Sequence, residues 1–125
     1  MTAKSIIKIA AIFALLGVAI GAFGEHSLEA MLTENDRLGT FETAVQYQFY
    51  HAAGLFIVGL LMLKAEHNFF RYAALAFITG IIIFSGSLYA LSITDISVLG
   101  AITPIGGLGF IIGWIFIIIG VHKSL

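Results

Sequence analysis

The chain has 125 residues, of which 60% are hydrophobic and 10% charged, with a formal net charge of −1 and a mean hydropathy of +1.07. A soluble domain of this length needs more polar residues to cover its surface, so the composition indicates a membrane protein. The near-neutral charge excludes nucleic acid as a partner. The lack of cysteine excludes disulfide, iron–sulfur and thiolate chemistry.

Four long apolar stretches predict four transmembrane helices, because a helix needs about 20 mainly apolar residues to cross the hydrocarbon core. In lipid, helices satisfy their own backbone hydrogen bonds, which makes them the expected spanning element. We therefore expect an all-α integral membrane protein, a single domain of residues 1–125 built as an antiparallel bundle of four helices. The spans are expected at about residues 6–24, 43–63, 71–93 and 98–121.

The first stretch also imitates a secretory signal, because Lys4 and Lys8 begin it and small residues end it at Ala22-Phe23-Gly24. Its apolar run is longer than a signal's usual core of about 7 to 15 residues. We therefore expect the segment to be retained as a span.

The basic residues predict which side of the membrane each end faces. With four spans, Arg37 lies alone on one side, and the other five lie on the opposite side: Lys4, Lys8, Lys64, Arg71 and Lys123. Because basic residues are enriched on the cytoplasmic side, both termini are expected to be cytoplasmic, in a plasma (inner) membrane.

The connection over residues 25–42 carries five acidic residues against one arginine. Apolar and charged residues alternate along it, which predicts a short amphipathic helix after Ser27, broken near residues 35–39. We expect this helix to lie on the outer membrane surface, as a lid or as a simple linker.

Small residues recur at helical spacing in the first and fourth stretches, which marks faces for close helix packing in lipid. Gly17 and Gly21 form a GxxxG pair in the first stretch, and Gly106, Gly109 and Gly113 repeat the device in the fourth. We expect these two helices to make the tightest contacts, either with each other or with another copy of the chain.

The only proline, Pro104, leaves two interpretations of the last stretch. In the first, Thr103 caps a helix that starts at Pro104, and residues 96–102 form a separate apolar piece. In the second, Pro104 kinks one longer helix.

Polar residues gather in the outer halves of the predicted helices, whereas the inner halves are aliphatic and aromatic. His51 follows Glu42 by nine residues, about 13 Å along a helix, which places it inside the hydrocarbon. An ionisable residue at that depth indicates a functional site by default. The candidate ligand-binding residues are His51, Tyr47, Gln48, Tyr89, Ser85, His26 and Thr103.

Three interpretations of this polar cluster stay open: hydrogen bonds that hold the helices together, a pocket for a lipid-like or small amphipathic ligand or a partner helix, or a site of catalysis or metal binding. The chain has no paired carboxylates or nucleophile–base spacing within the spans, and no two histidines have helical ligand spacing. We therefore favour non-enzymatic binding, with no cofactor and no metal. The alternatives are a structural or accessory membrane subunit and a small transporter or proton-handling protein. The expected partners are membrane lipids, a second copy or a larger membrane complex.

Four motifs succeed one another along the chain: Gly21-Ala22-Phe23-Gly24-Glu25-His26-Ser27-Leu28, then Thr43-Ala44 with Tyr47 and Tyr50-His51-Ala52, then Phe84-Ser85-Gly86-Ser87-Leu88-Tyr89, then Thr103-Pro104-Ile105-Gly106-Gly107 with Gly113-Trp114. On these motifs the whole chain resembles the small bacterial YgdD/YwdK-type membrane proteins, the domain of unknown function 423 family, related to a eukaryotic family of small transmembrane proteins. The resemblance implies a four-helix plasma-membrane protein without an established activity, so no catalytic residue is carried over.

Overall fold

The computed structural model describes all 125 residues, which form helices and short turns but no strand. In chain order the elements are α1 (Ala3–Val18), the π-helical η1 (Ala19–Gly24), α2 (Glu25–Glu34), α3 (Leu38–Lys64), α4 (Asn68–Gly80), the π-helical η2 (Ile81–Ser85), α5 (Gly86–Thr94), the 3-10 helix η3 (Ser97–Ala101) and α6 (Thr103–Ser124).

These elements join into four long rods: α1–η1–α2, then α3, then α4–η2–α5, then η3–α6. The rods contain 32, 27, 27 and 28 residues. At a rise of 1.5 Å per residue, even the shortest is about 40 Å long, enough to cross a hydrocarbon core of about 30 Å. Each predicted span lies within one rod.

Local sequence signals begin and end the rods. The Thr2 hydroxyl accepts the Ser5 amide at 3.1 Å, and the Ser5 hydroxyl accepts the Thr2 amide at 3.0 Å, which forms a capping box before α1. Asp36 and Asp95 end the first and third rods in the left-handed region, with φ of 55° and 56°. Aspartate is one of the few residues that adopt this conformation readily.

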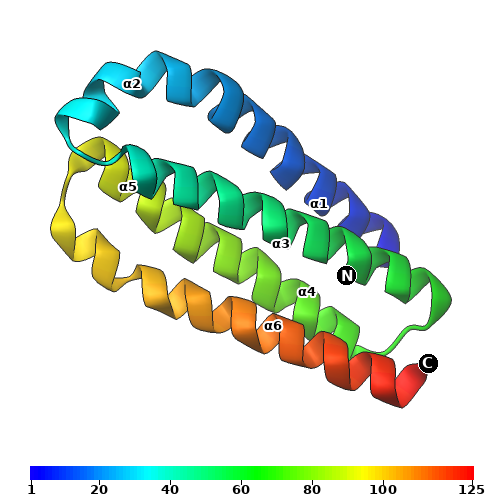
Figure 1. The fold of residues 1–125 in the computed structure, drawn as a ribbon. Helices are drawn as coiled ribbons and strands as arrows, with labels where there is room; N and C mark the ends of the chain where they lie inside the picture. The colour runs from blue at the N-terminus through cyan, green and yellow to red at the C-terminus, as the bar shows by residue number, and fades with distance from the viewer.

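Figure 1 shows the rods side by side in chain order, with successive rods antiparallel and both termini at the same end of the bundle. The first rod packs mainly on α3, and α6 packs mainly on the third rod. Between them lies an apolar core of buried side chains, among them Ile6, Leu55, Val58, Phe70 and Phe77. The structure is therefore a four-helix antiparallel bundle.

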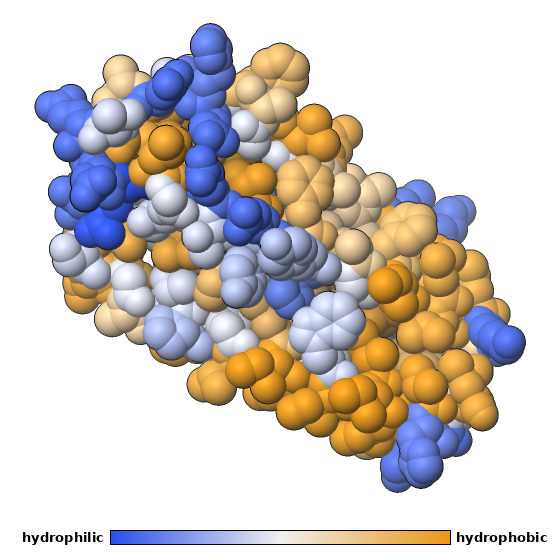
Figure 2. Space-filling model, viewed as in Figure 1, coloured by the Kyte–Doolittle hydropathy of each residue, from blue (hydrophilic) through white to orange (hydrophobic).

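Charge divides the bundle into two ends. The acidic end holds the turn of residues 35–37 and the turn at Asp95, and the basic end holds both termini. Figure 2 shows hydrophilic residues gathered over the end that carries α2, while most of the visible remainder is apolar, apart from small groups at the basic end. Large apolar side chains stay exposed along the rods, as lipid-facing helices require.

Side chains clasp the two turns of the acidic end together. Arg37 pairs with Asp95 through Nε and Oδ1 at 2.9 Å. The Asn35 amide donates to the carbonyl oxygens of Ser92 and Ile93 at 3.2 and 3.3 Å, which satisfies acceptors at the end of α5. The first and third rods are thus joined at this end without a direct connection in the chain.

Two expectations from the sequence differ from this structure. The segment after Ser27 is helical, but it is not set apart from the first span, because α2 continues the first rod. Thr103 does not cap α6, because its hydroxyl bonds to the Ser87 hydroxyl at 2.6 Å. Apart from that cap, the structure agrees with the first interpretation of Pro104, which lies in the first turn of α6 after the separate 3-10 helix η3.

Candidate functional site

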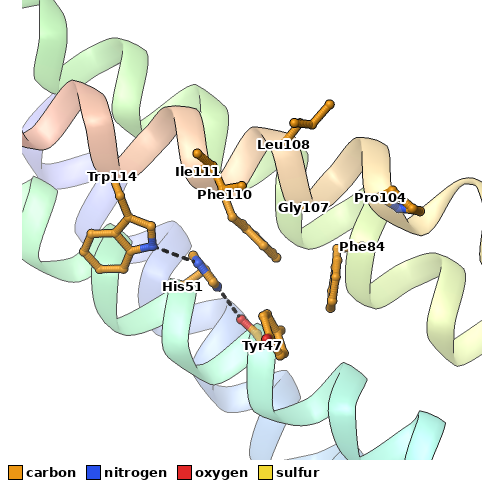
Figure 3. A pocket seen from close by; sticks show the side chains of 9 residues that line it. All are labelled: Tyr47, His51, Phe84, Pro104, Gly107, Leu108, Phe110, Ile111 and Trp114. Atoms are coloured by element: carbon orange, nitrogen blue, oxygen red, sulfur yellow. Dashed lines mark hydrogen bonds between the residues drawn. The ribbon is translucent and has the colours of Figure 1, made fainter.

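A groove of about 660 Å³ opens between α3 and α6. Its lining comes from α3, η2 and α6: Tyr47, His51, Phe84, Pro104, Gly107, Leu108, Phe110, Ile111 and Trp114. Figure 3 shows the aromatic side chains of these three elements turned toward the space between them. We call this space the α3–α6 groove.

His51 forms one wall of the α3–α6 groove, and both of its ring nitrogens are already bonded within the protein. Nδ1 lies 2.9 Å from the Tyr47 carbonyl oxygen, one turn earlier in α3. Trp114 donates its indole N–H to Nε2 at 3.0 Å. Because a carbonyl only accepts and an indole N–H only donates, these two bonds fit the tautomer in which Nδ1 carries the proton and Nε2 accepts. In this conformation His51 has no nitrogen free for a metal or for a ligand.

Ring stacking fixes the orientation of the groove walls. The His51 ring lies on Phe110 with centroids 3.5 Å apart and planes 8° apart. Tyr47 packs against Phe84 at 4.6 Å, and Trp114 packs edge-on against Phe77 at 4.8 Å. Such pairs contribute about 0.5 to 1.5 kcal/mol each beyond their buried area. The walls are therefore held in place before any molecule enters.

Three other polar candidates, Gln48, Ser85 and Tyr89, face a different direction. The Gln48 amide donates to the Phe13 carbonyl of α1 at 2.8 Å, and its oxygen accepts the Tyr89 hydroxyl at 2.6 Å. Ser85 donates to the Ala44 carbonyl at 2.7 Å. Gln48, Ser85 and Tyr89 line a smaller groove of about 270 Å³ beside α1.

The candidate residues thus divide into separate places and do not form one pocket. Tyr47 and His51 face the α3–α6 groove, while Gln48, Ser85 and Tyr89 face the α1 side. Adjacent residues on a helix point about 100° apart, which is why Tyr47 and Gln48 separate.

Thr103 and His26 lie apart from both grooves. Thr103 bonds to Ser87 and so ties α6 to α5. His26 lines a shallow polar hollow of about 240 Å³ at the acidic end, beside Glu25 and Glu29. No group of three or more histidine, aspartate or glutamate side chains is close enough together to hold a metal ion.

The glycines singled out in the sequence lie against neighbouring rods. A Cβ on Gly17 would come within 2.9 Å of Phe49, and one on Gly21 within 3.0 Å of Val45, both in α3. In α6, a Cβ on Gly106 would strike the Phe84 backbone, one on Gly109 would lie 3.3 Å from the Ala76 carbonyl, and one on Gly113 would lie 2.5 Å from Phe77. Each of these helices packs on its neighbour in the chain, so the first and fourth are not each other's main partners.

Of the residues that line the α3–α6 groove, only Tyr47 and His51 are among the candidate binding residues predicted from the sequence. Gly107 and Phe110 face α3 because of the rotation of α6, whereas Phe84 is placed by η2 of the third rod. The spacing of residues in α6 does indicate part of this lining. Gly107, Phe110 and Trp114 recur at spacings of three and four, which places them on one face of a helix.

The architecture and the composition together define a polytopic helical membrane protein. The profile described as "Protein of unknown function (DUF423)" matches residues 20–107. The chain belongs to this family. It is 48% identical over 123 residues to UPF0382 membrane protein YwdK of Bacillus subtilis, a match that covers 98% of this chain and 99% of that protein.

Other relatives match over a similar length. UPF0382 membrane protein SH2409 of Staphylococcus haemolyticus is 43% identical over 120 residues, which covers 96% of this chain and 97% of that protein. UPF0382 membrane protein SAUSA300_0565 of Staphylococcus aureus is 45% identical with the same coverage. No solved structure matches the chain.

Proposed function

We propose that the protein is a non-enzymatic membrane protein that binds a lipid-like or small amphipathic molecule in the α3–α6 groove. The observation that carries this proposal is a preformed aromatic groove on a lipid-facing surface. Its volume of about 660 Å³ lies in the range of small-molecule sites, about 300 to 1,000 Å³. Such sites are mainly apolar with few polar groups, as this groove is.

The position of the groove supports an amphipathic occupant. The exposed residues around it, such as Leu108 and Ile111, would face hydrocarbon, so a molecule can enter sideways from the bilayer. Tyr47 brings a hydroxyl to an otherwise apolar surface, as tyrosine does where a membrane meets water. One end of the occupant would thus be polar and the rest apolar.

A structural or accessory role is the second candidate, and a specific observation favours it. Every buried side-chain nitrogen or oxygen has a hydrogen-bond partner within the protein. The bonds of Gln48, Ser85 and His51 each join two rods, which suffices to align the bundle without a ligand.

We also propose a plasma-membrane location with both termini in the cytoplasm. The basic end carries five of the six lysine and arginine residues, and Arg37 alone lies at the acidic end. Basic residues are retained on the cytoplasmic side during insertion.

Filling the groove tests the binding proposal. A Cβ on Gly107 would meet only ring atoms of Phe84 at 3.9 Å, so Gly107→Leu places its side chain in the groove at little cost to packing. Gly86→Leu is the matched control, because a Cβ there meets nothing within 4 Å and Gly86 lines the smaller groove. Native mass spectrometry in a mild detergent would record adducts and oligomer mass for the wild type and both variants.

The expected result is a discrete adduct on the wild type and on the control variant Gly86→Leu, and the loss of this adduct from Gly107→Leu. Equal adducts on all three proteins would place the molecule outside the groove. A bare wild type with a larger oligomer or complex mass would favour the structural or accessory role.

A further inference from the structure

One hydroxyl in the α3–α6 groove has no partner. His51 and Trp114 use their polar atoms on each other and on the Tyr47 carbonyl. The Tyr47 hydroxyl makes no hydrogen bond within the protein, and the residue is 36% exposed at the groove. Away from water, an unpaired hydroxyl costs free energy, so it favours an occupant that brings a hydrogen-bond acceptor.

The groove runs along the bundle, with its free hydroxyl toward the acidic end. Tyr47 follows Glu42 by five residues, about 7.5 Å along α3 from the last charge of that helix's acidic end. Trp114 follows Pro104 by ten residues, so the α6 wall extends about 15 Å from the acidic end toward the basic end. Figure 3 shows Pro104 and Trp114 at opposite ends of this wall.

This arrangement restricts the chemistry of the occupant. A polar group must lie at the level of Tyr47, near the interface, while an apolar chain continues inward against the stacked His51 and Phe110 rings. No charged side chain lines the groove. A carboxylate or phosphate at the level of Tyr47 would therefore be left uncompensated, whereas a neutral carbonyl needs only the one donor that is present.

We infer that the α3–α6 groove holds one ester-linked chain of a glycerolipid, with the ester carbonyl accepting the Tyr47 hydroxyl and the acyl chain lying along α6. This inference rests on the proposed function and names the ligand class of the same groove. The ester carbonyls of a bilayer lie at the boundary between headgroups and chains, the depth at which tyrosine is enriched. The headgroup then projects toward the acidic end, where Glu42 is exposed and disfavours added negative charge.

The test compares two lipids that differ only at the linkage. Delipidated protein in detergent is titrated with dioleoyl phosphatidylethanolamine or with its diether analogue, which lacks both carbonyls, and the bound fraction is read by native mass spectrometry. One hydrogen bond of ordinary net strength corresponds to about a fivefold preference. We expect the wild type to bind the ester about fivefold more tightly than the ether.

Two tyrosine variants separate the contribution of the Tyr47 hydroxyl to lipid binding from that of its ring. Tyr47→Phe keeps the ring against Phe84 and should bind both lipids equally, at the level of the ether. Tyr50→Phe removes a hydroxyl that lies outside the groove lining, although its ring is 5.6 Å from that of Tyr47, and should keep the fivefold preference.

The possible failures are distinguishable. Equal binding of both lipids to the wild type, lost in Gly107→Leu, would overturn the ester inference and leave groove binding in place. Lipid binding that Gly107→Leu does not weaken would overturn both proposals. A wild-type dimer that Gly107→Leu converts to a monomer would show that a second copy of the chain covers the groove, and would overturn the lipid assignment.

Discussion

A histidine inside a membrane helix is tolerated when both ring nitrogens have partners, and His51 meets this condition through the Tyr47 carbonyl and the Trp114 indole. The two bonds also hold the ring flat on Phe110. His51 therefore shapes the groove through its ring face, while its Nε2 connects α3 to α6.

Replacing His51 should weaken the bundle. His51→Leu leaves the Trp114 N–H without a partner and removes the bond between α3 and α6, so we expect a loss of about 1 to 2 kcal/mol in the free energy of unfolding. Unfolding in mixed micelles with increasing sodium dodecyl sulfate measures this change.

A double-mutant cycle with Trp114→Phe isolates the bond itself. If the bond forms, the loss in the double variant should fall short of the sum of the single losses by about 0.6 kcal/mol or more. Strictly additive losses would contradict it. Tyr50→Phe is the control, because Tyr50 is exposed and its hydroxyl bonds to nothing in the protein.

The sequence alone identifies His51 as an ionisable residue inside a membrane span, but it does not identify the residue's hydrogen-bond partner on another helix. From the sequence, the predicted partners of His51 are Tyr47 and Gln48 on its own helix, and then Tyr89 or Ser85. The structure confines Tyr47's contribution to its backbone carbonyl and brings in Trp114, 63 positions away. Partner choice depends on how each helix is rotated about its axis. A helix that is apolar all round carries little information about that rotation.

In α6, close packing depends on whether a glycine leaves room for a neighbouring helix. Gly106 faces the Phe84 backbone of η2, and its neighbour Gly107 faces the groove. Both glycines occupy the same helical turn, so they share the same backbone setting and differ in what surrounds them.

The two glycines should respond to alanine in opposite ways. A Cβ on Gly106 would lie 2.8 Å from the Phe84 Cα, so Gly106→Ala forces α6 away from η2 and should cost about 1 to 3 kcal/mol. Gly107→Ala meets only ring carbons at 3.9 Å and should be neutral or slightly stabilising, because alanine favours helix. Unfolding of both variants under the same detergent conditions checks the difference, and equal stabilities would refute this packing of α6.

The number and length of the helices could be predicted from hydropathy, because the bilayer imposes both. The π-helical stretches η1 and η2 could not. Each inserts a residue into the helical repeat and so rotates the rest of its rod about the helix axis. In η2 this places Phe84 in the α3–α6 groove and Ser85 on the Ala44 carbonyl of α3. A helical wheel drawn at a constant 3.6 residues per turn ignores this π-helical stretch and so assigns these side chains to the wrong faces.

For the whole molecule, the distribution of charge predicts how the bundle is oriented in a membrane. The clasp of Asn35 and Arg37 on the third rod closes the acidic end, while lysines surround the termini at the basic end. The ends are therefore chemically distinct, and one orientation is favoured.

Cysteine labelling reads this orientation directly, because the chain contains no cysteine of its own. Ser97 is exposed at the acidic end, and Leu125 is exposed at the basic end. In intact bacterial cells, a membrane-impermeant maleimide should label Ser97→Cys, and should label Leu125→Cys only after the membrane is permeabilised. Thr33 is also exposed at the acidic end, but in a different rod. If the four rods insert as one unit, Thr33→Cys should be labelled in intact cells to the same extent as Ser97→Cys.

The reverse pattern would invert the orientation and place the Tyr47 end of the groove toward the cytoplasm. Partial labelling at both ends in intact cells would indicate two inserted orientations. The wild type has five basic residues at one end and one at the other, which makes two inserted orientations unfavourable. Adding lysines beside Arg37 reduces this difference and should produce both orientations. Such a variant would show that charge, and not the packing of the bundle, sets the orientation, on which the proposed outer-leaflet position of the groove depends.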